Sequence, residues 1–277
     1  MNRLLSAAFG LLILRSLAAA QAPDPDLARF LARRQARSAA PLVIAHRGHA
    51  RAAPENTLAA FASAIEARAD MVELDVQLTR DQRLIIFHDD RLERTTTGRG
   101  AVRAFTLAQI RRLDAGSWFH PRFTDQRVLS VQEAIRLVPA RMRINLELKR
   151  TRTPRPLLRR LRALLKSSRV RSRLLLSSFD ARLVKSLPDS GAMRALICRF
   201  RADHSLRQAI TLGCASWHPF YKLVTRRRMQ LAHAAGLRVY AWTVDDASQA
   251  RRLIHWGVDG IFTNHPAALR HAVRRAR

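Results

Sequence analysis

The sequence contains no apolar run long enough to cross a bilayer, which limits how the chain can meet a membrane. The apolar run near the N-terminus, Leu4–Leu14, spans 11 residues, whereas a membrane-spanning helix needs about 20. Arg3 precedes the run and the small residues Ala18–Ala20 follow it, which is the order of a signal peptide. We therefore predict a signal peptide over residues 1–22 and a periplasmic or secreted protein. The alternative is an uncleaved N-terminal anchor that leaves the protein attached to the membrane.

Cysteine is also scarce, since the chain contains two, Cys198 and Cys214. We predict that Cys198 falls late in one strand and Cys214 at the start of the next. In a parallel sheet these positions lie at opposite ends, beyond the Cα separation of about 7 Å that a disulfide can bridge. Two free, buried thiols are therefore expected.

Acidic residues are also few compared with basic ones. The chain has 21 acidic and 50 basic residues, a formal net charge of +29, and four of the basic residues are Lys, so that 46 are Arg. This excess suits either an anionic partner, such as a phospholipid surface or nucleic acid, or a solvated surface. The Arg residues are spread along the chain without interleaved aromatic residues or a nucleic-acid-binding motif. The pattern favours a solvated surface; we expect no nucleic-acid partner and keep an anionic membrane surface as an alternative partner.

Apolar residues are abundant, at 48% of the chain, and occur in short runs that alternate with amphipathic stretches. After a leader segment over residues 23–40, nine runs have the length and composition of strands. The predicted strands are residues 42–46, 71–78, 83–88, 143–149, 173–179, 194–200, 214–220, 238–244 and 260–264. Strands that alternate with helices through short links predict a mainly parallel sheet in one domain, residues 41–277.

Local signals mark several of the intervening helices. Ser130 and Glu133 have the spacing of a capping box. Gly236 and Gly257 stand where a helix would end in a left-handed residue. One apolar stripe at the helical period consists of Leu58, Phe61, Ala62 and Ile65.

The link between the second and third predicted strands decides the architecture. Strands 71–78 and 83–88 are joined by residues 79–82 alone, whereas parallel neighbours need a crossover of about a dozen residues. These two strands must therefore form an antiparallel hairpin, which leaves eight parallel strands. Eight strands in about 255 residues predict a TIM (β/α)8 barrel with an extra β-hairpin arm. The irregular stretch 89–130 is then a small insertion at the rim.

Two predicted strands carry charged residues along one face. Glu73 and Asp75 are two positions apart and project to the same side, between apolar neighbours. Burying two unpaired carboxylates is costly, and either a hard divalent cation or salt bridges to Arg would remove the cost. Strand 143–149 repeats the pattern with Glu147 and Lys149, and a third carboxylate favours the cation. Lys149 would suit an anionic substrate oxygen.

Two histidines end predicted strands close to these carboxylates. His46 ends the first strand and His88 ends the hairpin arm. A single histidine at a strand end is more often structural than catalytic. Two that converge on a carboxylate cluster favour proton transfer, because imidazole titrates near neutral pH. His218 is a further candidate to line the pocket.

Longer stretches of the chain resemble one family. IAHRGHARAAPENTLAAF, VELDVQLTRDQRLIIFHDDRLERTTTGRG and INLELK resemble the glycerophosphodiester phosphodiesterase family, and LLSSF, AWTVDD and GVDGIFTNHP match its later strands. The resemblance covers residues 42–266. It implies a barrel fold, a small-molecule glycerophosphodiester substrate, and hydrolysis of that substrate to glycerol 3-phosphate and an alcohol.

The resemblance also implies roles for individual residues and a divalent cation, Ca²⁺ or Mg²⁺. It assigns acid–base catalysis to His46 and His88, metal ligation to Glu73, Asp75 and Glu147, and substrate binding to Arg47, Lys149, Glu55 and Trp242. Two positions depart from the family pattern: Gln82 replaces a usual Gly in the hairpin turn, and Asn264 stands where an Asp is usual. Neither departure touches the implied metal ligands.

Two alternative functions are consistent with the sequence. One is a lipid phosphodiesterase of the lysophospholipase D type on the same scaffold. The other is a basic, non-catalytic protein that binds anions or membranes, although such a protein has no need of both histidines. The attacking group, either water or the substrate's own hydroxyl through a cyclic phosphate, stays open.

Overall fold

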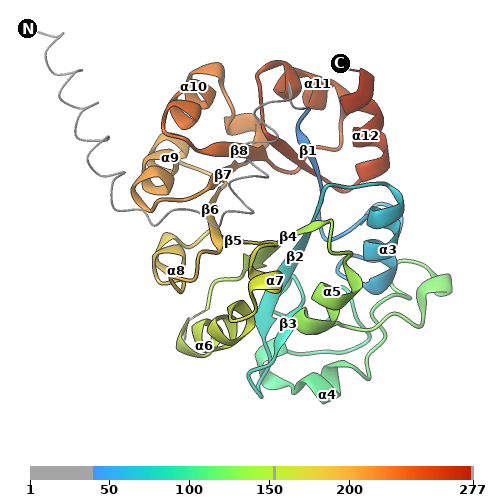
Figure 1. The fold of residues 1–277 in the computed structure, drawn as a ribbon. Coiled ribbons are helices and arrows are strands. Elements are labelled where there is room, and N and C mark those ends of the chain that lie inside the picture. Colours follow the sequence, from blue (N-terminus) through green and yellow to red (C-terminus); the bar gives the residue numbers. More distant parts are fainter. Residues whose placement is uncertain (1–39, 152–153, 276–277) are drawn as a thin grey trace, which may run out of the picture.

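Eight parallel strands form a closed barrel in the computed structural model, which describes residues 40–151 and 154–275 (Figure 1). The sheet runs in the order β1-β9-β8-β7-β6-β5-β4-β2, and a pairing between β1 and β2 closes it. The strands are β1 Leu42–Ala45, β2 Met71–Leu78, β3 Leu84–Ile86, β4 Arg143–Leu148, β5 Leu174–Ser178, β6 Met193–Cys198, β7 Ser216–Pro219, β8 Arg238–Ala241 and β9 Gly260–Thr263. The predicted TIM barrel is confirmed.

The ninth strand, β3, lies outside the barrel and pairs antiparallel with β2. Its register joins Val76 to Ile86 and Leu78 to Leu84. The hairpin predicted from the four-residue link is therefore confirmed. It returns the chain from the far end of β2 to the level of the barrel rim, which decides where His88 lies.

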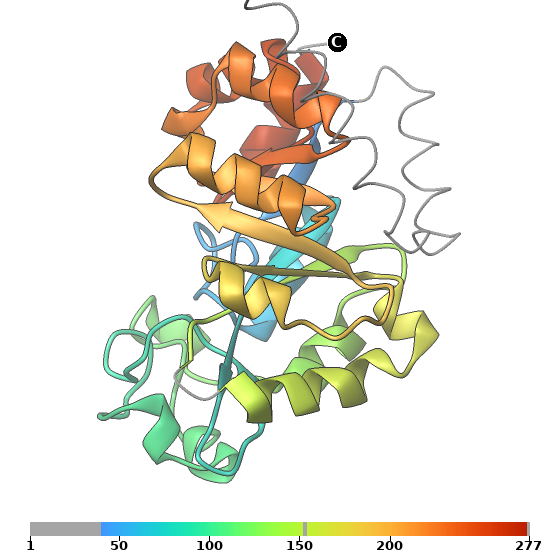
Figure 2. The ribbon, with the colours of Figure 1, turned by 90° about the vertical axis from the view of Figure 1, so that its left-hand side faces the viewer.

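Helices surround the barrel and complete each crossover (Figures 1 and 2). They are α3 Leu58–Glu66, α4 Leu107–Ile110, α5 Val131–Leu137, α6 Pro154–Leu165, α7 Ser168–Arg171, α8 Ala181–Lys185, α9 Ala202–Thr211, α10 Arg226–Ala234, α11 Ala247–His255 and α12 Pro266–Arg275, with short 3-10 turns η2 Val102–Ala104, η3 Pro121–Phe123 and η4 Tyr221–Leu223. The predicted rim insertion contains η2, α4 and η3. Both views place α4 beside β3, at one side of the barrel.

Three apolar clusters follow from the alternation of side chains along the strands. The largest fills the space between the barrel and its helices. The barrel interior is packed by Leu42, Ile44, Met71, Leu175, Met193, Ala195, Tyr240 and Phe262. A third cluster lies beneath the rim insertion and contains Ile85, Phe87, Leu92, Val102, Leu107, Ile110, Ala115 and Val128. The insertion therefore has a small core of its own, against the outer face of the hairpin arm.

Most local helix signals agree with the structure, and one is wrong in part. Ser130 and Glu133 form the capping box at the start of α5. Gly236 and Gly257 follow α10 and α11 with φ of 75° and 83°. The stripe predicted for α3 is displaced, because Ala60 and Ala64 are buried with Phe61, whereas Ala62 is exposed and Leu58 is 45% exposed. The helix turns its small residues inward because the loop after β1 approaches closely, as a Cβ added at Gly48 would lie 2.8 Å from Ala60 Cβ.

The two cysteines are free and buried, as predicted. Burial raises the pKa of the Cys214 thiol to about 12. No helix in the described part of the chain is both long and apolar enough to cross a membrane. The predicted signal peptide over residues 1–22 and the leader up to residue 39 lie outside the described residues and stay predictions.

The hairpin turn offers a test of backbone strain. Gln82 has a φ of 56°, in the left-handed region that costs an L-residue about 1–2 kcal/mol. Its carbonyl oxygen accepts a hydrogen bond from Arg160 Nε (2.8 Å) and its side chain contacts Arg159. We expect Gln82→Gly to raise the free energy of unfolding by about 0.5–1 kcal/mol in urea denaturation. Arg80→Gly, at a position without positive φ, should lower it; a loss of stability in both variants would contradict the argument.

Candidate active site

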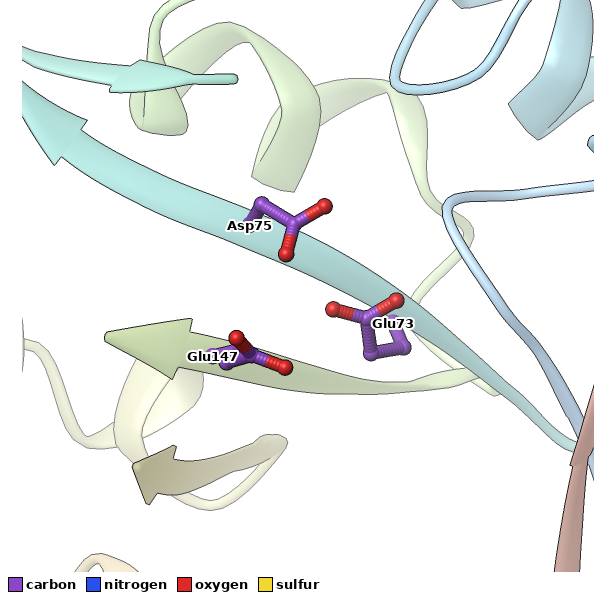
Figure 3. A group of neighbouring side chains, drawn as sticks. All are labelled: Glu73, Asp75 and Glu147. Atoms are coloured by element: carbon purple, nitrogen blue, oxygen red, sulfur yellow. The ribbon is translucent and has the colours of Figure 1, made fainter. Parts of the chain in front are cut away.

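Three carboxylates meet where β2 pairs with the carboxyl end of β4. Glu73 and Asp75 project from the same face of β2, and Glu147 on β4 is paired in register with Asp75 (Figure 3). One oxygen from each residue lies within 4.8 Å of those of the other two. Glu73 and Asp75 are each 1% exposed. All three acids lie on the inner face of the barrel wall, and the common side of Glu73 and Asp75 agrees with the prediction from strand parity.

Two cationic side chains contact this cluster. Arg47 Nε lies 3.2 Å from Asp75 Oδ2, and Lys149 Nζ lies 2.7 Å from Asp75 Oδ1 and also pairs with Glu147. The backbone N–H of Arg47 donates to Glu73 Oε2 (2.9 Å). Arg47 has a φ of 54°, a strained conformation that costs about 1–3 kcal/mol and is typical of functional sites. Three carboxylates thus face two cations, and Asp75 receives both.

The charge balance leaves the two glutamates short of positive charge. Burial, together with Asp75 and Glu147, raises the pKa of Glu73 well above its ordinary value, and burial with Asp75 raises that of Glu147. Burial would also raise the pKa of Asp75, but Lys149 and Arg47 outweigh it and hold that pKa below its usual range. Glu73 Oε1 is buried without a hydrogen-bond partner. A hard divalent cation fits this donor set, because it would supply both the missing partner and the missing charge.

His46 follows β1 and is oriented by an amide. Its Nδ1 lies 2.8 Å from Asn264 Oδ1, at the end of β9. Burial, with Arg47 next to it, lowers the pKa of His46 to about 4. The ring is therefore neutral near neutral pH, a state in which it can accept a proton.

His88 follows the hairpin arm and is oriented by a carboxylate. Its Nδ1 lies 2.5 Å from Asp89 Oδ1. Gln77 Nε2, on β2, donates to the carbonyl oxygens of Phe87, His88 and Asp89 at 3.1, 3.0 and 2.6 Å. The hairpin and this side chain together hold His88 beside the strand that carries Glu73 and Asp75. The two histidines thus have different partners, a neutral amide and an anion.

Glu55 connects the two sides of the rim. It accepts from Arg47 Nη1 (2.8 Å) and from both terminal nitrogens of Arg94 (2.9 and 2.7 Å). Arg94 also donates to both oxygens of Asp89 (2.5 and 3.0 Å). Burial opposes the effect, but the hydrogen bonds from Arg94 and His88 lower the pKa of Asp89 to about 2. A continuous chain of ion pairs therefore runs from Arg47 to Asp89, whose carboxylate contacts the His88 ring.

Arg94 is the central member of this chain, and its removal should loosen both ends. We expect Arg94→Ala to reduce phosphodiester turnover about 10-fold, the lower end of what partners of catalytic ligands contribute. Steady-state kinetics with Arg91→Ala as the matched control would check this, because Arg91 pairs with Glu93 in the same insertion. Equal activity of the two variants would show that the chain of ion pairs does not support the site.

Aromatic side chains form the opposite part of the rim. Trp242 Nε1 donates to the carbonyl oxygen of His218 (2.8 Å), and the Trp242 ring lies 5.5 Å from those of both Phe179 and Phe220. Phe179 is 47% exposed. Trp242 is thus anchored at the carboxyl ends of β7 and β8, on the side of the barrel away from the hairpin arm.

One candidate from the sequence is displaced. His218 is fully buried among the barrel interior residues, where its Nε2 bonds Ser216 Oγ (2.8 Å) and burial lowers its pKa to about 3. It does not line an open pocket, because its strand position lies below the rim. Sequence reasoning assigned no role to several residues of the site, although Gln77 shares strand parity with Glu73 and Asp75, and Asp89 is adjacent to His88. The unassigned residues are Asn56, whose Nδ2 donates to Asp75 Oδ2 (2.8 Å), together with Gln77, Asp89, Arg94 and Asp245.

Together these features define a class: a TIM-barrel hydrolase whose carboxylate cluster, paired histidines and fixed cations suit an anionic ester. A comparison with known families narrows the class. Residues 46–268 match the Glycerophosphoryl diester phosphodiesterase family. The chain belongs to this family, and the predicted family and enzyme class are confirmed.

Relatives with names and structures support this assignment. A glycerophosphodiester phosphodiesterase of Caldanaerobacter subterraneus subsp. tengcongensis is 36% identical over 239 residues, which cover 84% of this chain and 98% of the relative. One of Bacillus subtilis is 31% identical over 255 residues, covering 84% and 86%. The structure of an Oleispira antarctica phosphodiesterase in complex with the product sn-glycerol-3-phosphate has a TM-score of 0.78 and 32% identity, covering 84% of this chain and 97% of the other.

Proposed function

We propose that this chain hydrolyses glycerophosphodiesters to glycerol 3-phosphate and an alcohol, with Ca²⁺ or Mg²⁺ held by Glu73, Asp75 and Glu147. The observation that carries the proposal is the three-carboxylate cluster, in which Glu73 and Asp75 are buried and Glu73 Oε1 has no hydrogen-bond partner. The product bound to the Oleispira relative supports the substrate class. A non-catalytic role is disfavoured, because a binding module has no need of both histidines.

The residues around the cluster account for binding of the phosphate. A bound divalent cation would neutralise charge that develops on the phosphate oxygens. Arg47 and Lys149 bracket the cluster and add fixed positive charge where the phosphate would lie. Glu55 restrains the guanidinium of Arg47 through their 2.8 Å ion pair, so that little reorganisation is needed when substrate binds.

The different partners of the histidines favour different roles. His46 is held by the neutral amide of Asn264 and is unprotonated near neutral pH, so we assign it as the base that takes a proton from the attacking group. His88 is held by the Asp89 carboxylate, which balances a positive ring, so we assign it as the acid that protonates the leaving alkoxide. In both rings Nδ1 is engaged, which leaves Nε2 for the substrate.

A panel of phosphodiesters tests the proposal directly. Glycerophosphocholine, glycerophosphoethanolamine and glycerophosphoglycerol would be incubated with the chain in chelator, in Ca²⁺ and in Mg²⁺, and glycerol 3-phosphate measured by an enzyme-coupled assay. Release that requires a cation is expected, and release in none of the nine conditions would refute the function. Phosphorus NMR during turnover would show a cyclic phosphate if the substrate's own hydroxyl attacks.

A lysophospholipid is the second candidate substrate, because the aromatic rim offers an apolar surface for the acyl chain that such a substrate carries on its glycerol. Phe179 is 47% exposed and packs edge-on against Trp242 beside the carboxyl ends of the strands. Comparing kcat/KM for a lysophospholipid with that for glycerophosphocholine separates the two activities. A ratio above one would favour a lipid phosphodiesterase, for which an anionic membrane surface would be the natural partner.

We also propose that the chain is exported through the signal peptide predicted over residues 1–22. The order of Arg3, the apolar run Leu4–Leu14 and the small residues Ala18–Ala20 supports the proposal. N-terminal sequencing of the protein recovered from cell fractions should show a mature chain that has lost about these residues. A full-length chain in the membrane fraction would favour the uncleaved anchor instead.

A further inference from the structure

Asp245 lies behind His46 and makes no direct contact with it. It follows β8, whereas Asn264 follows β9, and the two strands are neighbours in the barrel. The carboxylate accepts three hydrogen bonds, from Thr263 Oγ1 (2.8 Å), from the backbone N–H of Asn264 (2.7 Å) and from Asn264 Nδ2 (2.7 Å). Both of its oxygens are therefore directed at the segment that carries the partner of His46.

These contacts allow only one orientation of the Asn264 amide. An ionised carboxylate accepts hydrogen bonds and cannot donate them, so the amide must present its Nδ2 to Asp245. The amide oxygen then faces His46, where Oδ1 lies 2.8 Å from Nδ1. The reverse orientation would place an amide oxygen against a carboxylate oxygen and would lose the hydrogen bond to Asp245.

The amide orientation in turn determines the tautomer of the neutral imidazole. Asn264 Oδ1 is an acceptor, so His46 Nδ1 must carry the proton and Nε2 must carry the lone pair. We propose that Asp245 is a positioning residue: it acts through Asn264 to keep His46 in the Nδ1–H tautomer and leaves Nε2 free to accept a proton. The inference rests on the proposed function only for the role of His46 as the base.

A neutral amide between the carboxylate and the imidazole has a distinct consequence. A carboxylate in contact with the ring would select the same tautomer but would also favour its protonated form. The arrangement Asp245–Asn264–His46 selects the Nδ1–H tautomer, but the Asn264 amide separates the negative charge of Asp245 from the imidazole. His88, which contacts Asp89 directly, shows the other arrangement in the same site.

Asp245→Asn should invert the whole chain of hydrogen bonds. The Oδ1 of the new side chain would still accept from Thr263 and the Asn264 backbone, so its Nδ2 would face the Asn264 amide. That amide would then rotate, accept through Oδ1 and donate Nδ2 to His46 Nδ1, which moves the proton to Nε2. Nitrogen-15 NMR of the His46 ring near neutral pH should show Nδ1–H in the wild type and Nε2–H in the variant. Because Nε2 of His46 would then carry a proton and could not accept another, kcat of the variant should fall by about 10²–10⁴-fold, with KM changed little.

The exchange variant Asp245→Asn/Asn264→Asp distinguishes positioning from a merely structural role. Here the residue at 245 would donate to a carboxylate at 264, and that carboxylate would accept from His46 Nδ1, which restores the Nδ1–H tautomer. Because that carboxylate also favours the protonated ring, we expect the ring nitrogen shifts to return to the wild-type pattern, and most of kcat to be recovered, above the pH at which the ring of this variant deprotonates. If Asp245 only stabilised the local fold, this exchange would not restore kcat or the tautomer.

Asp246→Asn is the matched control, because Asp246 is the adjacent acid and caps α11 through Gln249 (2.8 Å). It should keep wild-type kcat and the Nδ1–H tautomer. A wild-type ring already in the Nε2–H form, or an Asp245→Asn variant with unchanged tautomer and kcat, would overturn the inference. The NMR result needs no substrate, so a chain that releases no glycerol 3-phosphate would refute the proposed function while the tautomer test still decides the positioning role.

Discussion

Turnover of glycerophosphocholine should fall by about 10²–10⁴-fold when either His46 or His88 is replaced by Ala, because each variant lacks one of the two proton transfers of the reaction. His46 would no longer accept the proton of the attacking group, and His88 would no longer protonate the departing choline oxygen. Initial rates of glycerol 3-phosphate release at saturating substrate and cation would measure both losses. His255→Ala is the matched control, since this exposed residue ends α11 and contacts Arg226.

The two histidines can be separated by the leaving group. A glycerophosphodiester of p-nitrophenol releases a stable anion and needs little protonation, so His88→Ala should recover most of its activity on this substrate. His46→Ala should stay inactive on both substrates, because the attacking group needs its base whatever departs. Recovery in His46→Ala instead would reverse the assignment of acid and base, and near-normal turnover of glycerophosphocholine in either variant would remove that residue from the mechanism.

Removal of divalent cations should abolish activity, and Ca²⁺ or Mg²⁺ should restore it. The physical reason is that Glu73, Asp75 and Glu147 face two cationic side chains and leave a buried oxygen unpartnered. Binding to the folded state alone should also stabilise it, by about 2.7 kcal/mol at a cation concentration of 100 times Kd. Thermal unfolding in chelator and in each cation would therefore report binding independently of turnover.

Glu73→Gln provides the decisive variant for the cation. It keeps the side-chain volume but removes a buried negative charge, so in chelator it should unfold no earlier than the wild type. It should lose both the stabilisation by cation and the activity. Glu66→Gln, on the exposed face of α3, should behave as the wild type. Full activity of Glu73→Gln, or of the wild type in chelator, would refute the metal site.

The elements that could be predicted are those with a short-range signature. The hairpin followed from a link too short for a crossover, and the register of Val76 with Ile86 confirms it. The common face of Glu73 and Asp75 followed from strand parity, whereas the pairing of Asp75 with Glu147 came from the structure. The prediction that Leu58 belongs to the buried stripe of its helix was wrong, because the periodicity of apolar residues alone does not tell which face of the helix packs against the barrel.

The residues that were not assigned lack such a signature. Arg94 joins Glu55 to Asp89 from within an irregular insertion, and many other arginines in the sequence have similar surroundings. Asp245 contacts Asn264, and Asn264 in turn contacts His46. Asp245 and Asn264 follow β8 and β9, which are far along the chain from β1, the strand that precedes His46. Pairings of this kind depend on closure of the barrel, which no window of the sequence contains.

The sequence by itself determined the strand count, the hairpin, the common face of Glu73 and Asp75 and, through its family motifs, the two histidines. Each depends on periodicity, link length or residue identity, which are local properties of the chain. The tertiary structure alone decided which partner each histidine has, an amide for His46 and a carboxylate for His88. It also decided that two cations fall short of neutralising three acids, two of them buried, because charge balance depends on distances between strands.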